Sequence, residues 1–290
     1  MNLKILSKYN NLNLTFSKNL NTTNKNHLFH LVNPSIWPFV TAFFVLLTVL
    51  GGVKSMHNYS NGGITFFTGL FLVTMSAYFW WSDIIVESKL HHTSQVRDGL
   101  RLGMILFIIS EVMFFFGFFW AAFSAILSPT VQIGSVWPPV GIETMSYTGI
   151  PLYNTILLLS SGAFITCAHH TLINSKKYST KAISNSIINI SFIVTLFLAI
   201  CFTLFQAYEY SIADFHIHSG IYGSIFYLTT GFHGLHVLIG TIFLAVCYVR
   251  FLKREFTKKQ HIGFESAVWY WHFVDVVWIL LYIVIYWWGS

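Results

Sequence analysis

The sequence predicts an all-α integral membrane protein with seven transmembrane helices. Its 290 residues are 55% hydrophobic and only 9% charged, whereas soluble domains carry about 25% charged residues. Seven stretches reach the roughly 20 apolar residues that a helix needs to cross a bilayer. These stretches are apolar on most faces, which argues against the short alternating strands of a membrane β-barrel.

Each predicted helix is separated from the next by turn-forming residues or by a basic segment. The helices are expected at about residues 36–56, 63–86, 99–126, 152–175, 184–210, 219–251 and 264–288. The breaks include Asn61-Gly62-Gly63, Ser128-Pro129, Trp137-Pro138-Pro139, Gly149-Ile150-Pro151 and Ser219-Gly220. Residues 1–30 are rich in Asn and Lys and contain no acidic residue and no long apolar run, so a polar extension is expected there.

The basic residues predict the orientation of the chain. With seven crossings, all of the 16 Lys and Arg residues except Lys54 fall on one side of the membrane. Because the loops that stay on the side of synthesis carry the excess of basic residues, the N-terminus is expected on that side and the C-terminus on the other. Trp80 and Trp81 at one interface, and Trp287 and Trp288 at the other, would suit interfacial anchors.

Several ionisable residues lie within the predicted helices, where a charged group costs about 3 kcal/mol on insertion scales and therefore needs a partner or water. His233 and His236 lie three residues apart, as do His272 and Asp275, so each pair shares one helical face. The buried polar candidates for a structural or proton-related role are Glu111, Glu209, His233, His236, His272 and Asp275.

Three interpretations of these residues are open. A metal ion would be bound by His233 and His236 with Glu111 as a third ligand. A proton pathway would use Glu111 and the histidines. The interpretation that we favour is a polar network that ties the helices together, because Gly231 and Gly234 beside the two histidines indicate close helix packing. No catalytic residue and no metal ligand is assigned.

The chain resembles subunit III of cytochrome c oxidase, of the mitochondrial type, in a set of stretches that follow the order of that family. The set is much more specific than any one of its members and reaches from residue 30 to the C-terminus. It comprises HLVNPSIWPF at 30–39, DGLRLGMILFIISEVMFF at 98–115, WPPVGIE at 137–143, AHH at 168–170, FQAYEY at 205–210, GFHGLHVLIG at 231–240 and WYWHFVDVVWILLYIVIYWWGS at 269–290.

The resemblance implies a seven-helix fold in which two helices, within residues 31–90, and five helices, within residues 91–290, form a V-shaped bundle with phospholipids in its cleft. It implies a non-catalytic core subunit of respiratory complex IV. Such a subunit would support electron transfer from cytochrome c to oxygen and coupled proton translocation by stabilising subunit I, holding structural phospholipids and aiding proton uptake.

The same resemblance implies the surroundings of the chain. It would lie in the inner mitochondrial membrane, with its N-terminus in the matrix and its C-terminus in the intermembrane space. It would carry no cofactor of its own, since haem and copper would be bound by partner subunits. The implied partners are subunits I and II, accessory subunits and phospholipids including cardiolipin; nucleic acid is not among them.

Glu111 matches the carbodiimide-reactive, membrane-embedded glutamate of the family's SEV motif. We expect its carboxyl group to contact one histidine of the sixth or seventh helix, namely His233, His236 or His272.

One stretch departs from the family pattern. The family's WWRDVIRES appears here as WWSDIIVES at 80–88, where Ser82 and Val86 replace two arginines that would suit lipid headgroups. Lipid binding at that end of the cleft would need substitutes for them. The candidate lipid-binding residues are Trp80, Trp81, Asp83, Glu87, His91, Arg97 and Arg250.

Two other functions fit a seven-helix membrane protein less well. A stand-alone proton or ion transporter is suggested by Glu111 and Asp275, but the sequence shows no inverted repeat and no pair of proline-broken helices. A seven-helix receptor or retinal protein would need an external N-terminus or, for a retinal Schiff base, a lysine in the seventh helix, and that helix contains none.

Overall fold

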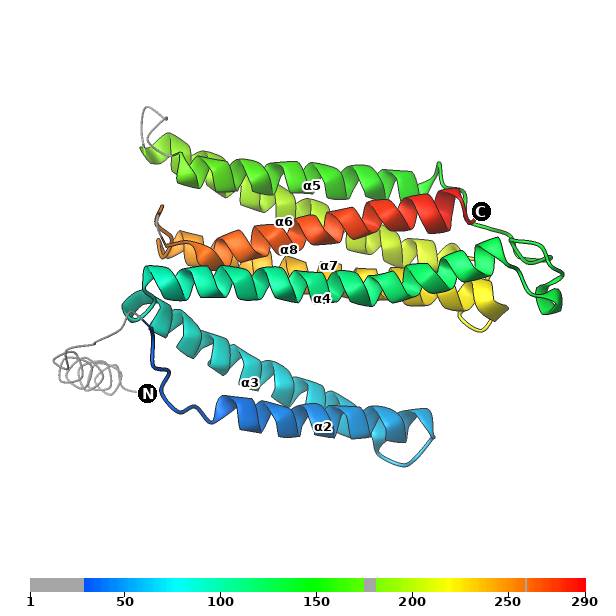
Figure 1. Cartoon of the computed structure of the whole chain (residues 1–290), viewed down its shortest axis with the longest axis horizontal. Coiled ribbons are helices and arrows are strands. Elements are labelled where there is room, and N and C mark those ends of the chain that lie inside the picture. The colour runs from blue at the N-terminus through cyan, green and yellow to red at the C-terminus, as the bar shows by residue number, and fades with distance from the viewer. Residues whose placement is uncertain (1–28, 175–180, 259) are drawn as a thin grey trace. The chain divides into compact units, whose positions relative to one another are not determined.

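The computed structural model describes residues 29–174, 181–258 and 260–290, and Figure 1 shows the arrangement of its helices. Within these ranges the regular elements are all helical, which confirms the predicted fold class. Seven helices are long and apolar enough to cross a membrane. They are α2 (Trp37–Met56), α3 (Gly62–Leu90), α4 (Ser94–Leu127), α5 (Ile150–Ile173), α6 (Lys181–Ile212), α7 (Gly220–Leu252) and α8 (Ile262–Leu281).

Two short elements complete the described structure. A 3-10 helix, η1 (Val131–Ile133), lies in the connection after α4, and a π-helix, η3 (Tyr282–Trp287), continues α8 to the end of the last span. Each predicted helix overlaps an observed one in the same order. The largest differences are at α4, which begins five residues before the expected start at residue 99, and at α8, which ends at Leu281 and leaves the rest of the expected helix to η3. The predicted extension over residues 1–30 lies almost entirely outside the described residues.

The chain forms two compact units, one ending at Gly99 and the other beginning at Leu100. Their V-shaped arrangement stays a prediction. In the first unit, α2 and α3 pack closely because glycines remove the side chains between them. A Cβ added at Gly51 would overlap the backbone of Phe66, and one at Gly69 would overlap the backbone of Thr48. Small residues permit this approach of two helix backbones in a membrane.

The second unit is built around α8. In the most apolar window of this helix 61% of the residues are buried, compared with 11% for α4. Two tryptophans of α8 are completely buried and reach α5, because the indole N–H of Trp271 donates to Ser161 Oγ (2.9 Å) and that of Trp278 donates to Thr155 Oγ1 (2.9 Å). These bonds satisfy the polar end of each indole and fix α8 against α5.

Candidate functional site

Glu111 on α4 is bonded to His236 on α7. Its Oε2 lies 2.8 Å from His236 Nε2, which confirms the expectation that this carboxyl contacts a histidine of the sixth or seventh helix. The other ring nitrogen, Nδ1, lies 2.6 Å from the carbonyl oxygen of Phe232, one turn earlier on the same helix. The ring centroids of Phe114 and Phe115 lie 6.3 and 5.1 Å from that of the imidazole, so aromatic side chains pack beside the pair.

This geometry limits the proton arrangements of the Glu111–His236 pair to two. A carbonyl oxygen only accepts hydrogen bonds, so His236 Nδ1 must carry a proton. Nε2 then either accepts from a protonated Glu111 or donates, as imidazolium, to a carboxylate. One proton is shared between the two side chains in both cases, and the pair as a whole has no net charge. A neutral pair is the arrangement that costs least at membrane depth.

His233 lies one turn away from His236 but belongs to a different environment. Its Nε2 lies 3.2 Å from the carbonyl oxygen of Val274 on α8, and the ring packs against Trp278 with a centroid distance of 5.1 Å. Within the described ranges, no three His, Cys, Asp or Glu side chains are placed to hold a metal ion. The interpretation with His233, His236 and Glu111 as metal ligands therefore has no geometric support.

The expectation that Gly231 and Gly234 mark a close packing of helices beside these histidines is wrong. A Cβ at Gly231 or Gly234 would meet no atom within 4 Å. The close approach of α7 to another helix lies instead at Gly240, where an added Cβ would come within 2.9 Å of the Trp271 ring.

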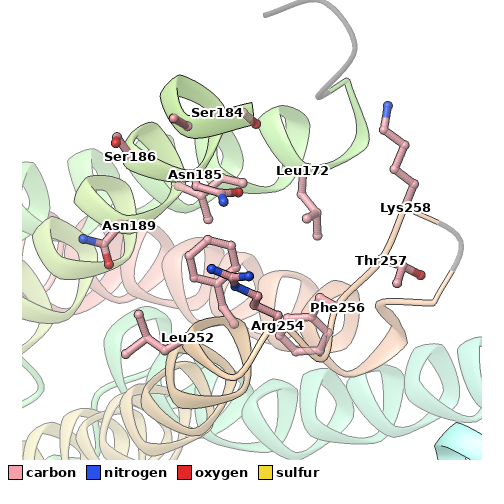
Figure 2. Close-up of a pocket in the computed structure, with 13 residues that line it drawn as sticks. Leu172, Ser184, Asn185, Ser186, Asn189, Leu252, Arg254, Phe256, Thr257 and Lys258 are labelled. Atoms are coloured by element: carbon pink, nitrogen blue, oxygen red, sulfur yellow. The ribbon is translucent and has the colours of Figure 1, made fainter. Parts of the chain in front are cut away.

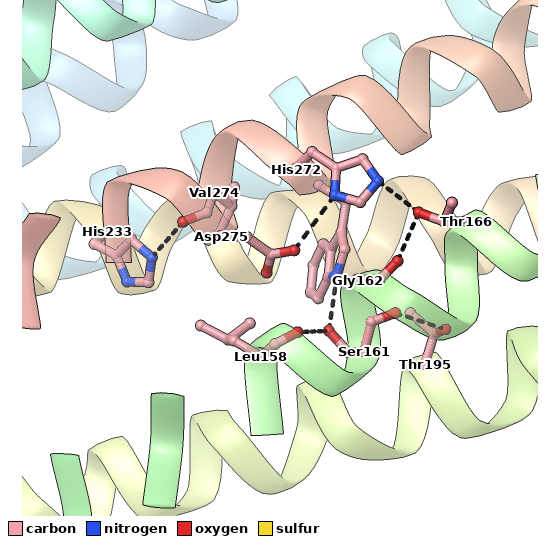
Figure 3. Close-up of polar contacts among 10 residues, drawn as sticks. Leu158, Ser161, Gly162, Thr166, Thr195, His233, His272, Val274 and Asp275 are labelled. Carbon is pink, nitrogen blue, oxygen red and sulfur yellow. Dashed lines mark hydrogen bonds and ion pairs between the residues drawn. The ribbon is translucent and has the colours of Figure 1, made fainter. Parts of the chain in front are cut away.

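His272 and Asp275 form a second carboxyl–imidazole pair, on α8 (Figure 3). His272 Nδ1 lies 3.5 Å from Asp275 Oδ2, and His272 Nε2 lies 2.8 Å from Thr166 Oγ1 on α5. Thr166 donates its own proton to the carbonyl oxygen of Gly162, so its oxygen accepts from the histidine. The absence of a side chain at Gly162 leaves room for this pair, because an added Cβ would overlap Asp275 Oδ2.

Glu209 is completely buried near the C-terminal end of α6. The hydroxyl group of Tyr286, on η3, donates to Glu209 Oε1 at 2.6 Å. Neither Glu209 Oε2 nor the side-chain amide of Gln206 has a hydrogen-bond partner among the described residues. Tyr210 donates to Thr230 Oγ1 at 2.7 Å, which connects α6 to α7 beside this carboxyl group. Together these contacts fix the C-terminal end of α6 against α7 and η3.

Several predicted lipid-binding residues have partners within the protein. The indole N–H of Trp37 donates to Asp83 Oδ2 at 2.7 Å. His91 stacks on His30 at 4.9 Å. Arg250 donates to Glu255 Oε2 at 3.0 Å and lies 4.8 Å above the Phe256 ring.

The remaining lipid candidates are at or near the surface. Trp81 has 64% of its surface exposed. Trp80, Glu87 and Arg97 are of intermediate exposure. Lipid binding by these residues stays a prediction.

Among the interhelical contacts that sequence reasoning missed, two involve a charged side chain near the end of a helix. One is the bond of Trp37 to Asp83. The other is Arg101 on α4, whose Nε donates to Glu265 Oε2 on α8 at 3.0 Å. Each joins residues far apart in the sequence, and no local spacing indicates such a pairing. The only signal was that charged residues near apolar helices require a partner.

A family model described as cytochrome c oxidase subunit III matches residues 27–290. The chain belongs to this family. Cytochrome c oxidase subunit 3 of Chondrus crispus is 51% identical over 266 residues, which cover 91% of this chain and 95% of the relative. That of Sus scrofa is 51% identical over 271 residues, covering 92% and 100%. That of Marchantia polymorpha is 50% identical over 271 residues, covering 93% and 99%.

Membership of the subunit III family makes the chain a component of cytochrome c oxidase, the oxidoreductase of respiratory complex IV. It is a multi-pass membrane protein of mitochondrial type. The pairs Glu111–His236, His272–Asp275 and Glu209–Tyr286 are therefore found in a member of the subunit III family.

Proposed function

We propose that the chain is a non-catalytic subunit that stabilises subunit I, while haem and copper reside in partner subunits. In this way it supports electron transfer from cytochrome c to oxygen and coupled proton translocation. The observation that carries the proposal is the Glu111–His236 bond between α4 and α7. It places a carboxyl group at membrane depth, satisfies it within the chain and leaves the pair neutral. A carboxyl group bonded in this way holds α4 and α7 together.

The proposal extends to what covers the outside of the chain. Many large apolar side chains are exposed on the membrane-spanning helices, among them Phe116, Trp120, Phe197 and Ile242. An apolar surface of this extent is expected to contact lipid and partner helices. We assign subunits I and II, accessory subunits and phospholipids, including cardiolipin, to this role. Trp81 and Arg97 remain candidates for headgroup contacts, and proton uptake into subunit I is aided indirectly, through its stabilisation.

The orientation forms part of the same proposal. The N-terminus lies in the matrix and the C-terminus in the intermembrane space of the inner mitochondrial membrane. The support is the distribution of basic residues, since Lys54 alone lies on the opposite side from the rest.

Purification through a tag on this chain in mild detergent tests the function. The expected eluate has an a-type haem spectrum, contains copper and includes a larger partner subunit. A colourless, metal-free eluate from membranes that do contain oxidase contradicts the proposal. In that case proton flux would be measured with the purified chain in liposomes, because Asp275 and Glu209, both buried in the bundle, would then favour a transporter.

A further inference from the structure

A pocket of about 940 Å³ lies where the connections α5–α6 and α7–α8 meet (Figure 2). Its polar wall comes from the first turns of α6, and its apolar wall from the ends of α5 and α7 and from Phe256. Among the described residues, two that are cationic and none that is acidic line it. The lining residues are Leu172, Ala182, Ser184, Asn185, Ser186, Ile188, Asn189, Phe251, Leu252, Arg254, Phe256, Thr257 and Lys258.

Arg254 is the central cation of this pocket. In Figure 2 its guanidinium group lies between the α6 side chains and Phe256, whereas Lys258 stands at the rim. The described residues provide no ion-pair partner for Arg254, in contrast to Arg250, which is paired with Glu255. A guanidinium group presents several N–H donors in a planar fork that matches the oxygens of a phosphate.

The backbone of Arg254 supports a functional role for this side chain. Its φ angle of 57° lies in the left-handed region, which is normally occupied by glycine or asparagine at the end of a helix. The turn is held by the bond from Arg254 N to Phe251 O (2.9 Å) and by that from Glu255 N to Arg250 O (3.1 Å). A residue with a side chain is strained in this region, and strained backbone is concentrated at ligand-binding and other functional sites.

The opposite wall offers hydrogen-bond donors. Ser184 lines the pocket with only 1% of its surface exposed, and its Oγ has no hydrogen-bond partner among the described residues. Asn189 accepts a bond from Tyr248 through Oδ1, so its amide nitrogen remains the donor of that side chain. The pocket also lies at the N-terminal end of a long helix, where backbone N–H groups favour anions.

We propose that this pocket binds a phosphate-bearing anion, with Arg254 as the principal cation, Lys258 as a second cation at the rim and Ser184 as a buried donor. The source of the phosphate is either a soluble polyphosphate or the headgroup of an anionic phospholipid. The site is distinct from the lipid-binding candidates at residues 80–97, because it is formed by the α5–α6 and α7–α8 ends of the second unit.

The test uses the assembled oxidase in phosphatidylcholine nanodiscs and measures the rate of Lys258 acylation by peptide mass spectrometry. Lys253, which does not line the pocket, is the internal reference. Inorganic pyrophosphate is added at constant ionic strength, so that general screening affects both lysines equally. We expect pyrophosphate to slow the acylation of Lys258 and not that of Lys253.

Variants then assign the effect to Arg254. Arg254→Asn removes the cation while keeping a residue that tolerates the left-handed turn, and Lys253→Asn is the matched control in the same loop. The pyrophosphate concentration that half-protects Lys258 should rise about tenfold or more in Arg254→Asn, since a charge-assisted hydrogen bond is lost. In Lys253→Asn it should change by less than about twofold.

The lipid source is distinguished by repeating the measurement in nanodiscs that also contain phosphatidylglycerol. A headgroup ligand protects Lys258 in these nanodiscs without pyrophosphate, and this protection is lost in Arg254→Asn. A soluble ligand leaves Lys258 unprotected until pyrophosphate is added. Three results overturn the proposal: equal effects of the two variants, no protection by either probe, or a Lys258 that does not react in phosphatidylcholine alone, because a partner subunit then covers the pocket.

Discussion

Tyr286 donates a hydrogen bond of 2.6 Å to Glu209, which lies on another helix 77 residues earlier. The tyrosine belongs to the π-helix η3 and the carboxyl group to α6. Both residues are buried, with 1% and 0% of their surfaces exposed. Since this bond is the only one that the structure shows for the Glu209 carboxyl group among the described residues, it is the contact through which the C-terminal segment is fixed to α6.

Tyr286→Phe should destabilise the assembled oxidase by about 1–3 kcal/mol, because it leaves a buried carboxyl group without a donor. The midpoint of thermal inactivation measures this effect. Tyr208→Phe is the matched control, since Tyr208 also lies on α6 but is 56% exposed. Equal midpoints for the two variants would show that the Tyr286–Glu209 bond contributes nothing to stability.

Glu111→Gln should leave oxygen consumption within about twofold of the unaltered complex, because the group that it replaces contacts no reacting atom. His236 Nδ1 is already committed as a donor to Phe232 O, so the glutamine amide can donate to Nε2 and keep the tie between α4 and α7. Glu111→Leu cannot do so and should cost about 1–3 kcal/mol of stability. Oxygen electrode rates and inactivation midpoints are compared at equal haem content.

A complete loss of activity in Glu111→Gln, with normal assembly, would contradict the structural role of this pair. The proton-pathway interpretation would then take its place, since the amide keeps the hydrogen bond but cannot exchange a proton as a carboxyl group does.

Gly162→Ala should disrupt the His272–Asp275 pair, because the new methyl group would occupy the position of Asp275 Oδ2. Overpacking of this kind costs about 1–3 kcal/mol. Gly231→Ala is the control within α7, where an added Cβ meets nothing within 4 Å; there the substitution should be neutral or stabilise the helix by up to about 1 kcal/mol. The thermal inactivation midpoints of the two variants decide between these expectations, and a stable Gly162→Ala enzyme would refute the first.

Gly69→Ala should separate α2 from α3, because its methyl group would overlap the Thr48 backbone. Backbone atoms cannot move aside as a flexible side chain can, so the loss should be at least as large as the roughly 1–3 kcal/mol of a typical overpacked core. Gly63→Ala lies on the same helix with nothing within 4 Å of its Cβ and serves as the control. Faster amide hydrogen exchange in residues 37–56 of Gly69→Ala alone is the expected result.

The histidines at the end of α3 give the first unit a pH dependence. Burial lowers the pKa of His92 below its ordinary value of 6.5, and repulsion from His30 lowers it further; Glu87 opposes the shift, while His91 and Arg97 add to it. The folded protein therefore holds the neutral ring, while the unfolded segment binds a proton more readily. The stability contributed by this group is complete above pH 6.5 and is lost as the pH falls through the lower pKa of the folded state.

Amide hydrogen exchange in residues 29–36, corrected for its intrinsic pH dependence, should therefore quicken when the pH is lowered from about 7.5 to about 5.5. In His92→Gln, which cannot titrate, the acceleration should be smaller. An acceleration of the same size in both proteins would show that His92 is not responsible.

The helices could be predicted from the sequence because the membrane imposes their length. Each span needs an apolar run, and each run is visible without knowledge of its neighbours. The start of α4 was missed because Ser94, Gln95 and Arg97 are polar, and hydropathy does not detect a helix that extends beyond the apolar core. The π-helical end of α8 was missed for a related reason, since its residues are as apolar as those of an α-helix.

The site could be predicted only in part. A carboxyl group within a membrane needs a partner, so a contact between Glu111 and a histidine could be predicted. Which of His233, His236 and His272 makes this contact depends on how α4 and α7 pack. The pairing of Tyr286 with Glu209 depends on the π-helical register of the last turn. Such pairings are properties of the packed bundle, and a single sequence contains no local pattern for them.

The glycine contacts of the first unit have a consequence for the biogenesis of the chain. The contacts of Gly51 with Phe66, Gly62 with Ser55 and Gly69 with Thr48 all involve residues before position 70. The other contacts between α2 and α3, such as that of Trp37 with Asp83, lie within the first 90 residues, so the packing surface between these two helices is complete before the later helices are made. This pair can enter the bilayer and associate while the ribosome is still translating the helices that begin near residue 100.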